Sequence, residues 1–506
     1  MVILVWILGD QLLKAHPALH TAEEIAPKKD LIVVLIESQR QLQRHRYHIK
    51  KLTFLISAMR HYAEELRASG FQVKIIQALD TISGLKEFSL HHQISEIFTM
   101  AASSIRGQTF QEQLSTELSL PITILPNTQF LCGQFDPFPD VQPNQIIRQE
   151  TFYRSMRGHF GLLMEENRQP VSGQWNLDAK NRQPLPRDHQ PPVVLGFEPD
   201  QLTRQVIQEV RTNYQTIGCP EGFTLATTRA QANLAAEDFF NNRLIHFGTY
   251  EDAMHSNHEI LYHSKLSPYI NAGLLEPLEL AKRAENAYWD GEADLNNVEG
   301  FIRQVVGWRE YMYWQYQRLP PKLFQEPFTI KSNPLPKFFW DGKIEMNCLK
   351  HVIDRVLESG YCHHIERLMI LTNFCLLAEI NAEEVFDWFM STFVDAYEWV
   401  MVPNVYGMGL YGGDGQIATK PYISSANYIN KMSNYCKYCA YDKNSRTGSN
   451  ACPFNFLYWH FLIKNEDTLR KNHRMARMFY HLQNFSEKEK KEIKKRVADF
   501  FKNPQS

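Results

Sequence analysis

The sequence lacks several features that would each point to a particular class of protein. It contains no run of about 18 consecutive apolar residues, so no membrane-spanning helix is expected. Its 8 cysteines in 506 residues are too few for a disulfide-stabilised extracellular scaffold, and we expect a cytoplasmic protein. The 54 Lys and Arg nearly balance the 56 Asp and Glu, so net charge alone indicates no nucleic-acid partner.

Common catalytic signatures are missing as well. The sequence has no Walker A motif, no H-E-x-x-H and no G-x-S-x-G, so nucleotide hydrolysis, zinc proteolysis and serine-type acyl transfer lose their usual support. One literal G-x-G-x-x-G occurs at residues 407–412, but it neither follows a buried strand nor opens a strand–helix unit. We therefore interpret it as a loop and not as a dinucleotide site.

The first 130 residues alternate short apolar runs with helical patterns. The apolar start of the chain has no basic segment and no small-residue cleavage site, so we interpret it as a buried strand and not as a signal peptide. Such alternation predicts a Rossmann-like parallel sheet covered on both faces. The expected strands are Val2–Leu8, Leu31–Ile36, Val73–Leu79, Ile94–Met100 and Ile122–Leu125, with a long helix over Gln39–Ser69.

The rest of the chain divides into two parts of different composition. Residues 131–229 are rich in proline, which predicts a connector with short helices near Gln149–Glu166 and Pro199–Tyr214. Residues 230–506 follow a period near 3.6 and predict a large all-helical domain. The expected helices there are Ala230–Arg243, Pro277–Tyr288, Val298–Tyr316, Cys348–Ser359, Ile365–Glu379 and Ala382–Phe393.

The C-terminal region stands out by charge and by cysteine spacing. Between Lys431 and Ser506 there are 16 Lys and Arg against 7 Asp and Glu, an excess of 9 positive charges. A basic end on a neutral chain is typical either of a polyanion-binding surface or of a solvated helix. Cys436, Cys439 and Cys452 follow a C-x2-C-x12-C-P pattern that suits zinc or an iron–sulfur cluster, with a fourth cysteine from elsewhere. Spacing alone also leaves open that no metal is bound.

Four short segments, in the same order along the chain, resemble the photolyase/cryptochrome family. Residues 263–269 (HSKLSPY) resemble its T-S-R-L-S-P-Y element, and residues 307–311 (GWREY) resemble W-R-E-F/Y. Residues 361–367 (YCHHIER) resemble W-x-H-[NH]-x-x-R, and residues 387–390 (DWFM), followed by Asp395, resemble a stretch that ends in an acidic flavin-pocket residue. The resemblance extends over nearly the whole chain.

Within this family, the cysteines are similar to those of the iron–sulfur bacterial cryptochromes and photolyases, the prokaryotic (6-4) photolyase branch. That branch carries a [4Fe–4S] cluster, and its pattern implies the ligands Cys348, Cys436, Cys439 and Cys452. The resemblance therefore supplies Cys348 as the fourth ligand.

The resemblance also implies FAD, bound in the helical domain. By matching position, its phosphates and ribityl chain would be held by Tyr250, Ser264, Lys265, Leu266 and Ser267. Arg367 would pair with Asp395 beside the isoalloxazine. Met401 stands where common photolyases place an Asn opposite flavin N5, and a thioether is a weak acceptor for an N–H.

Further roles follow for the lesion, the electrons and an antenna. Trp308 and Glu310 would lie near the lesion pocket, and His364 would act as general acid, aided by His363. Trp388 and Trp340 would relay electrons, since the family's usual tryptophan triad is not evident. In the N-terminal domain, Asp10 and Glu37 follow strands and would bind an antenna chromophore, which in this branch is often 6,7-dimethyl-8-ribityllumazine. The alternative is that these two are ordinary surface carboxylates.

The leading hypothesis is light-driven repair of (6-4) pyrimidine–pyrimidone photoproducts, with UV-damaged DNA as partner and a monomeric protein with no membrane contact. In this hypothesis, reduced FAD lends an electron to a flipped lesion, and basic residues of the C-terminal region contact phosphates, among them Lys437, Arg446, Arg474 and Arg477. A photoreceptor of the cryptochrome type without repair activity is the second hypothesis. A light-independent iron–sulfur protein that binds nucleic acid is the third.

Overall fold

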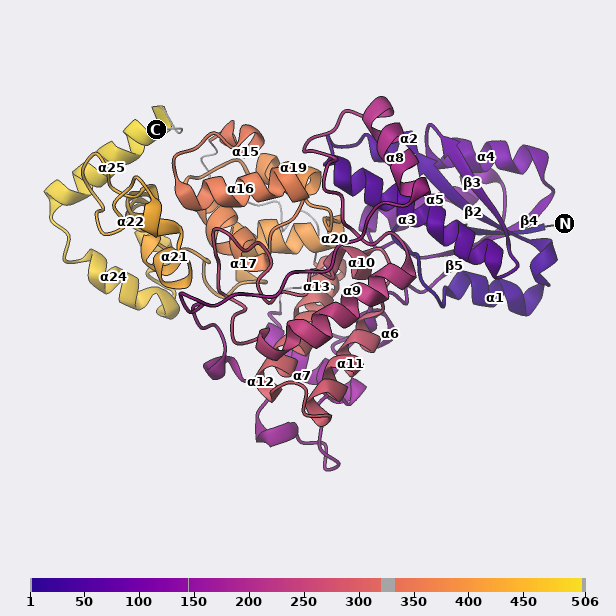
Figure 1. Cartoon of the computed structure of the whole chain (residues 1–506), viewed down its shortest axis with the longest axis horizontal. Coiled ribbons are helices and arrows are strands. Elements are labelled where there is room, and N and C mark those ends of the chain that lie inside the picture. The colour runs from indigo at the N-terminus through magenta and orange to yellow at the C-terminus, as the bar shows by residue number, and fades with distance from the viewer. Residues whose placement is uncertain (1, 144, 320–332, 503–506) are drawn as a thin grey trace.

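The computed structural model describes residues 2–143, 145–319 and 333–502. Figure 1 shows the N-terminal sheet at one end of the molecule, a helical body in the middle and the C-terminal helices at the other end. The parts of the molecule thus follow one another in chain order, and the helical region that contains most of the predicted site residues lies beside the N-terminal sheet.

A parallel sheet of five strands forms the N-terminal part. The strands pair in the order β3-β2-β1-β4-β5, and every pairing is parallel. β1 and β2 are central, and nearly all their side chains are buried, as expected for strands with helices on both faces. The bounds are β1 Val2–Ile7, β2 Leu31–Ser38, β3 Gln72–Ala78, β4 Ile94–Met100 and β5 Ile122–Leu125.

Helices cover the two faces of this sheet. One face packs on α1 (Pro17–Ile25) and α3 (Ile49–Ala68), and the other on α4 (Thr81–His91) and α5 (Ile105–Leu118). The single helix expected over residues 39–69 is wrong at its start, because the structure has a short α2 (Gln39–Leu42) and then a break before α3. The predicted parallel α/β sheet is confirmed.

The proline-rich segment and the helical region follow. The proline-rich segment contains α6 (Leu131–Gln134), α7 (Gln149–Phe160) and α8 (Gln201–Asn213). The predicted helical C-terminal region is confirmed. Its α-helices are α9 Arg229–Asn242, α10 Ser267–Asn271, α11 Pro277–Trp289, α12 Leu295–Ile302, α13 Glu310–Arg318, α15 Phe338–Asp341, α16 Asn347–Ser359, α17 His364–Glu366, α18 Asn373–Leu377, α19 Ala382–Thr392, α20 Glu398–Met401, α21 Ala426–Met432, α22 Pro453–Lys464, α23 Glu466–Leu469, α24 Ala476–Leu482 and α25 Glu487–Lys502.

Three segments of the helical region have π-helical hydrogen bonding. They are Arg303–Arg309 between α12 and α13, Arg367–Thr372 between α17 and α18, and Val402–Gly409 after α20. The last contains the first half of the glycine-rich stretch, Gly407–Gly409, so the loop interpretation is wrong for these residues. A Cβ at Gly409 would meet Thr372 at 2.8 Å, so the two segments pack closely. π-helical turns are frequent at functional sites, and all three segments contribute to the cavity described below.

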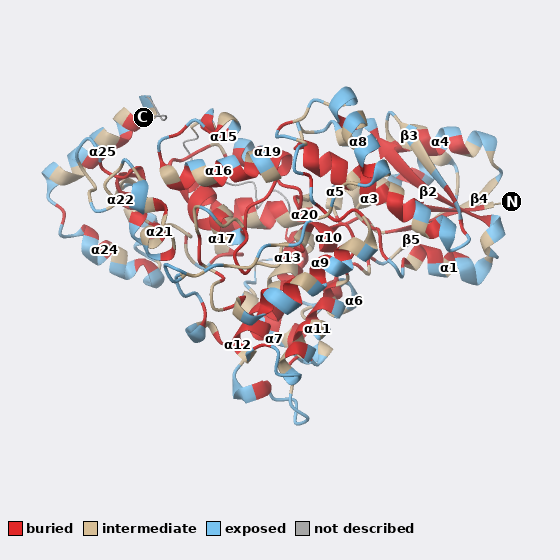
Figure 2. Ribbon diagram, viewed as in Figure 1, coloured by how far each residue is buried: buried red, intermediate tan, exposed pale blue. Residues whose placement is uncertain are grey.

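One continuous apolar core joins the sheet to the helical region (Figure 2). The backbone N–H of Leu12 donates to the carbonyl of Ala272 at 2.9 Å, and the Arg229 guanidinium donates to the carbonyl of Leu12 at 2.7 Å. Side chains of α3 also reach the end of α19. The sheet and the helical region are therefore held together by both apolar packing and buried hydrogen bonds.

Candidate functional site

The main candidate site is a cavity of about 570 Å³ in the helical region. All three π-helical segments line it, together with α10, α20 and the loop around Tyr422. Its volume lies within the range of small-molecule and cofactor sites. Its wall is mostly apolar but carries a small set of charged and hydroxyl groups, which can fix the orientation of a bound molecule.

An arginine–aspartate ion pair forms one wall of the cavity. The guanidinium of Arg367 binds both carboxylate oxygens of Asp395, at 2.9 and 3.0 Å, and the Ser267 hydroxyl donates to the same carboxylate at 2.6 Å. Arg367 also donates to the carbonyl of Cys362 at 2.8 Å. Bidentate pairs of this kind hold their geometry tightly, so the structure brings the predicted Arg367 and Asp395 together as a fixed polar feature.

Of the two neighbouring histidines, His364 lines the cavity. The enclosing protein lowers the pKa of His364 to about 4 by desolvation, and the charge of Arg367 acts in the same direction. His363 does not line the cavity; it is fully buried and stacks on the cavity residue His263, with ring centroids 4.3 Å apart. His364 is therefore a neutral imidazole at pH 7 in the free protein.

The other residues predicted around the flavin and the lesion divide into two groups. Ser264, Ser267, Trp308 and Met401 line the cavity. Tyr250, Lys265, Leu266 and Glu310 lie behind its walls.

Glu310 is fully buried, where it pairs with Arg309 and accepts the backbone N–H of Cys132 at 3.0 Å. Its role in the structure described here is to join α13 to the segment after β5. The Tyr250 ring packs against the rings of His189, His246 and Tyr262 instead.

A series of aromatic rings begins at the cavity wall and includes Trp388. Phe389 lines the cavity, and its ring centroid lies 5.2 Å from that of Trp388, which is fully buried. The Trp388 indole donates to the carbonyl of Phe339 at 2.8 Å, and the next residue, Trp340, is 40% exposed. The Trp388 ring thus contacts the rings of Phe389 and Phe339, whereas Trp340 follows Phe339 in the chain. Sequence reasoning missed Trp399, which lines the cavity beside the Arg309 guanidinium.

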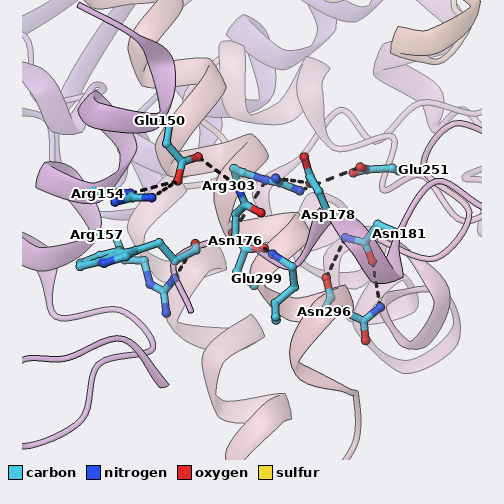
Figure 3. Close-up of polar contacts among 12 residues, drawn as sticks. Glu150, Arg154, Arg157, Asn176, Asp178, Asn181, Glu251, Asn296, Glu299 and Arg303 are labelled. Carbon is cyan, nitrogen blue, oxygen red and sulfur yellow. Dashed lines mark hydrogen bonds and ion pairs between the residues drawn. The ribbon is translucent and has the colours of Figure 1, made fainter. Parts of the chain in front are cut away.

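The connector contributes residues that sequence reasoning also missed. Arg182 lines the cavity and donates to Glu251 at 3.0 Å, and Glu251 also lines it. Figure 3 shows Arg303 placed between Asp178, Glu251 and Glu299. Burial raises the pKa of Glu251, while the neighbouring arginines oppose this. Charged residues within the proline-rich segment, such as Asp178 and Arg182, could have indicated this contribution, but we interpreted the segment as a connector.

The carboxylates of Glu37 and Asp10, predicted to bind an antenna, both accept hydrogen bonds from side chains of the sheet domain. Glu37 accepts from Arg60 at 2.8 and 3.0 Å and from Gln77 at 3.0 Å. Asp10 accepts from the Ser103 hydroxyl at 2.7 Å, and burial raises its pKa. Close by, the hydroxyl of Tyr397 is buried and has no hydrogen-bond partner among the described residues.

The four predicted cysteine ligands come together from distant parts of the chain. Cys348 in α16, Cys436 and Cys439 near α21, and Cys452 just before α22 line one small cavity. Burial, together with the neighbouring cysteines, raises the pKa of Cys436 to about 11 and that of Cys348 well above its usual range. Within residues 2–143, 145–319 and 333–502, no three His, Cys, Asp or Glu side chains are arranged to hold a single metal ion.

The four basic residues predicted to contact DNA differ in their surroundings. Lys437, Arg474 and Arg477 are exposed, and Arg474 also donates to the hydroxyl of Thr419, beside the cavity residue Lys420. Arg446 instead pairs with Glu489 at 2.5 Å and lies over the Phe485 ring.

None of the helices in the described residues is long and apolar enough to cross a bilayer.

Comparison with known proteins gives a consistent result. The family model described as deoxyribodipyrimidine photo-lyase-related protein matches residues 5–225. A protein named (6-4) photolyase from Agrobacterium fabrum (strain C58) is 40% identical over 506 residues, which cover 99% of this chain and 99% of that protein.

Two solved structures are similar in fold. The bacterial class III photolyase of Agrobacterium tumefaciens superposes with a TM-score of 0.60 at 15% identity, covering 85% of this chain and 84% of the other. The cryptochrome of Synechocystis sp. PCC6803 superposes with a TM-score of 0.56 at 15% identity, covering 81% and 82%.

Proposed function

The chain belongs to the photolyase/cryptochrome family, and on this premise we propose that it is an enzyme that repairs (6-4) pyrimidine–pyrimidone photoproducts in DNA with light. The full-length similarity to a (6-4) photolyase supports this activity. The proposal rests on one observation: a single cavity is lined by His364, Arg367, Asp395 and Trp308. UV-damaged DNA is the substrate that this activity requires.

We propose FAD as the resident cofactor of the cavity. The volume of about 570 Å³, the apolar walls and the few fixed polar groups suit a flat ring system joined to a polar chain. When bound, FAD supplies the light-excited electron that the lesion borrows. Ser264 and Ser267 offer hydroxyls to its polar chain, and the Arg367–Asp395 pair gives the ring a fixed charged neighbour. Met401 offers the ring only a thioether, which is a weak acceptor.

His364 is the residue we propose to hold and move the proton during repair. In the free cavity its low pKa keeps the imidazole neutral. Negative charge arriving with a lesion phosphate or a transferred electron raises the pKa of a nearby imidazole. With its pKa raised, the His364 imidazole takes up a proton from solvent, donates it to the group that moves between the two bases, and takes it back afterwards. His363 does not line the cavity but stacks on His263, which does, and we propose that it helps to position His364.

The ring series from Phe389 through Trp388 to Trp340 is our proposed route for electrons that reduce the cofactor from outside. The neighbouring rings are close: the centroid distance is 5.2 Å for Phe389–Trp388 and 5.1 Å for Trp388–Phe339, and Phe339 precedes Trp340 in the chain. The exposed Trp340 can meet an external reductant. Trp399 is a less suitable relay, because the Arg309 cation lies over its ring and disfavours loss of an electron from it.

We propose that Cys348, Cys436, Cys439 and Cys452 hold a [4Fe–4S] cluster. Four thiolates around one zinc at about 2.3 Å would lie about 3.8 Å from one another, whereas each cysteine of a cubane cluster binds a different iron, which needs a wider set. Four cysteines around one cavity, without a single-ion arrangement in the described residues, suit the wider set. Raised thiol pKa values mean that binding releases protons.

An antenna, which we propose to be 6,7-dimethyl-8-ribityllumazine, would bind at the strand ends near Asp10 and Glu37. The Glu37 carboxylate offers about four acceptor positions, of which Arg60 and Gln77 take three. One position on the Oε1 atom therefore remains for a ring N–H. The unpartnered Tyr397 hydroxyl, near Asp10, is a second polar group available to such a ring.

The division of the chain into residues 1–130, 131–229 and 230–506 stays a proposal. The contacts of Asp178 and Arg182 with Arg303 and Glu251 support a connector that packs on the helical domain. We also retain the proposals of a monomeric and cytoplasmic protein.

The decisive experiment uses the purified holoprotein and an oligonucleotide with one (6-4) photoproduct. With FAD chemically reduced, blue light is expected to restore two thymines per lesion, whereas the dark control restores none. No repair by a protein with fully reduced FAD would contradict the enzyme and favour a photoreceptor. A preparation with no flavin absorbance near about 450 nm would favour a light-independent nucleic-acid protein.

A further inference from the structure

Lys51 is a buried cation that crosses from the sheet domain into the helical domain. It lies in the first turn of α3 and is 3% exposed. Its ammonium donates to two backbone carbonyls of the helical domain, those of Met390 and Ala396, each at 2.8 Å. The Tyr47 ring lies 4.8 Å from the same nitrogen.

The surroundings of Lys51 give a charged side chain little stabilisation. Within the described part of the chain, no carboxylate forms an ion pair with it, and its hydrogen bonds go to neutral carbonyls. Burial lowers the pKa of Lys51 to about 7, against the opposing effect of Asp395. A buried cation without an ion-pair partner costs free energy, and an apolar side chain of the same size often replaces such a group without loss. Stability alone therefore does not explain a lysine here.

The two carbonyls that Lys51 binds stand on either side of the cavity's aspartate. Met390 is near the end of α19, Ala396 precedes α20, and Asp395 lies between them. The backbone N–H of His48 also donates to the carbonyl of Ser391 at 2.7 Å. The start of α3 thus fixes the whole segment that carries Asp395, from the side opposite the cavity.

We propose that Lys51 is a positioning residue of the flavin site, which holds the Asp395 segment in place and adds a buried positive charge behind the Arg367–Asp395 pair. The inference rests on the proposed binding of FAD and names a residue of the sheet domain as part of that site. Its expected effect is to favour the reduced cofactor, because a nearby positive charge stabilises the added negative charge.

The titratable groups that face Lys51 can be separated by pH. Asp395 faces it from the helical domain, and His45 and His48 face it from its own domain. Burial lowers the pKa of each histidine to about 4, as it does for His364 in the cavity. Between pH 6 and 8 these three imidazoles stay neutral, so among these groups only Lys51 changes its charge in that range.

The test compares Lys51→Met and Lys51→Arg with the matched control Lys50→Met. Lys50 lies one residue away, is 5% exposed and donates to the carbonyl of Gly222 in the connector, away from Asp395. The measured quantities are the FAD content and the two-electron reduction potential of the bound flavin.

We expect Lys51→Met to bind FAD and to disfavour the reduced form at least tenfold, which is a shift of about 30 mV for a two-electron couple. Lys50→Met should leave the potential unchanged. Equal potentials in wild type and Lys51→Met, or an equal shift in Lys50→Met, would overturn the proposal.

A measurement on the wild type and Lys51→Arg does not depend on the methionine variant folding. The wild-type potential should show an additional fall between pH 6 and 8 as Lys51 loses its proton, whereas the guanidinium of Lys51→Arg stays charged and should remove this step. The same pH profile in both proteins would contradict the inference. A wild-type protein that binds no FAD would instead refute the proposed function and is recognised before any variant is made.

Discussion

Two arginine–carboxylate pairs of nearly equal geometry occupy very different places in this molecule. Arg60 binds both oxygens of Glu37 at 2.8 and 3.0 Å at the end of β2, and Arg367 binds both oxygens of Asp395 at 2.9 and 3.0 Å. The first pair is completed by Gln77 of its own domain and by Glu209 of α8 in the connector. The second forms part of the wall of a cavity of about 570 Å³.

The comparison shows that the pair itself does not define a site. Around Glu37 the surrounding side chains use most of the hydrogen-bonding capacity, so that pair mainly stabilises the sheet domain and its contact with α8. Around Asp395 the protein leaves space, and the charges face a volume that something else must fill. Function therefore depends on what the neighbours of the pair leave open.

The largest expected effect comes from Asp395→Asn. The change leaves the buried Arg367 without its charge partner, which costs about 3–5 kcal/mol of unfolding free energy. We expect loss of bound FAD and of repair, checked by chromophore extraction and urea unfolding. Asp387→Asn is the control, because Asp387 is largely exposed on α19 and its carboxylate pairs with His45. Equal FAD content in Asp395→Asn and wild type would remove the distinction between the two pairs.

The next effect is that of His364→Ala. Loss of a general acid lowers the rate by about 10²–10⁴-fold, while FAD binding should persist because Arg367 and Asp395 remain. Since the pKa of His364 is about 4, the protonated fraction rises as pH falls, so the wild-type repair rate should increase from pH 8 to 5. The variant should show a flat profile, measured by product analysis after single light flashes. Full repair by His364→Ala would contradict the assignment; His473→Ala, an exposed histidine, is the control.

A smaller effect is expected from Glu37→Gln, which breaks the other arginine pair. Arg60 keeps Glu209, so the loss should be about 1–3 kcal/mol, typical of a hydrogen bond to a charged group. FAD content should not change, in contrast with Asp395→Asn, whereas bound lumazine should decrease in the extracted chromophores. Glu209→Gln should cost less than about 1 kcal/mol, because Glu209 is 42% exposed. Loss of FAD in Glu37→Gln would show that the two pairs are coupled.

The smallest effect concerns the basic surface. Arg474→Ala should lower the slope of log K against log salt by about 0.9, the value for one phosphate contact. Arg446→Ala should change it less, because Arg446 is paired with Glu489. Binding of lesion DNA at several salt concentrations checks both, and identical slopes in Arg474→Ala and wild type would exclude Arg474 from the interface.

Some of this organisation was accessible from local patterns. The five apolar runs became five parallel strands, and the helix expected over Ala382–Phe393 is α19. The long helix expected over residues 39–69 is broken, because the His48 backbone N–H bonds to Ser391 and its ring caps Lys50, which fixes the start of α3 at Ile49. That contact joins residues more than 340 positions apart, and no local pattern contains it.

The sequence by itself determined the parallel sheet, the helical region and the motif residues, because apolar period and residue type are local properties. Only the tertiary structure decided which of these residues share a space: it brought Arg182 from the connector and Trp399 to the cavity, and it placed Glu310 behind the wall. It also inserted Lys51 beside Met390 and Ala396, two residues from another domain. Such contacts follow from how the domains pack, and packing is a property of the whole chain.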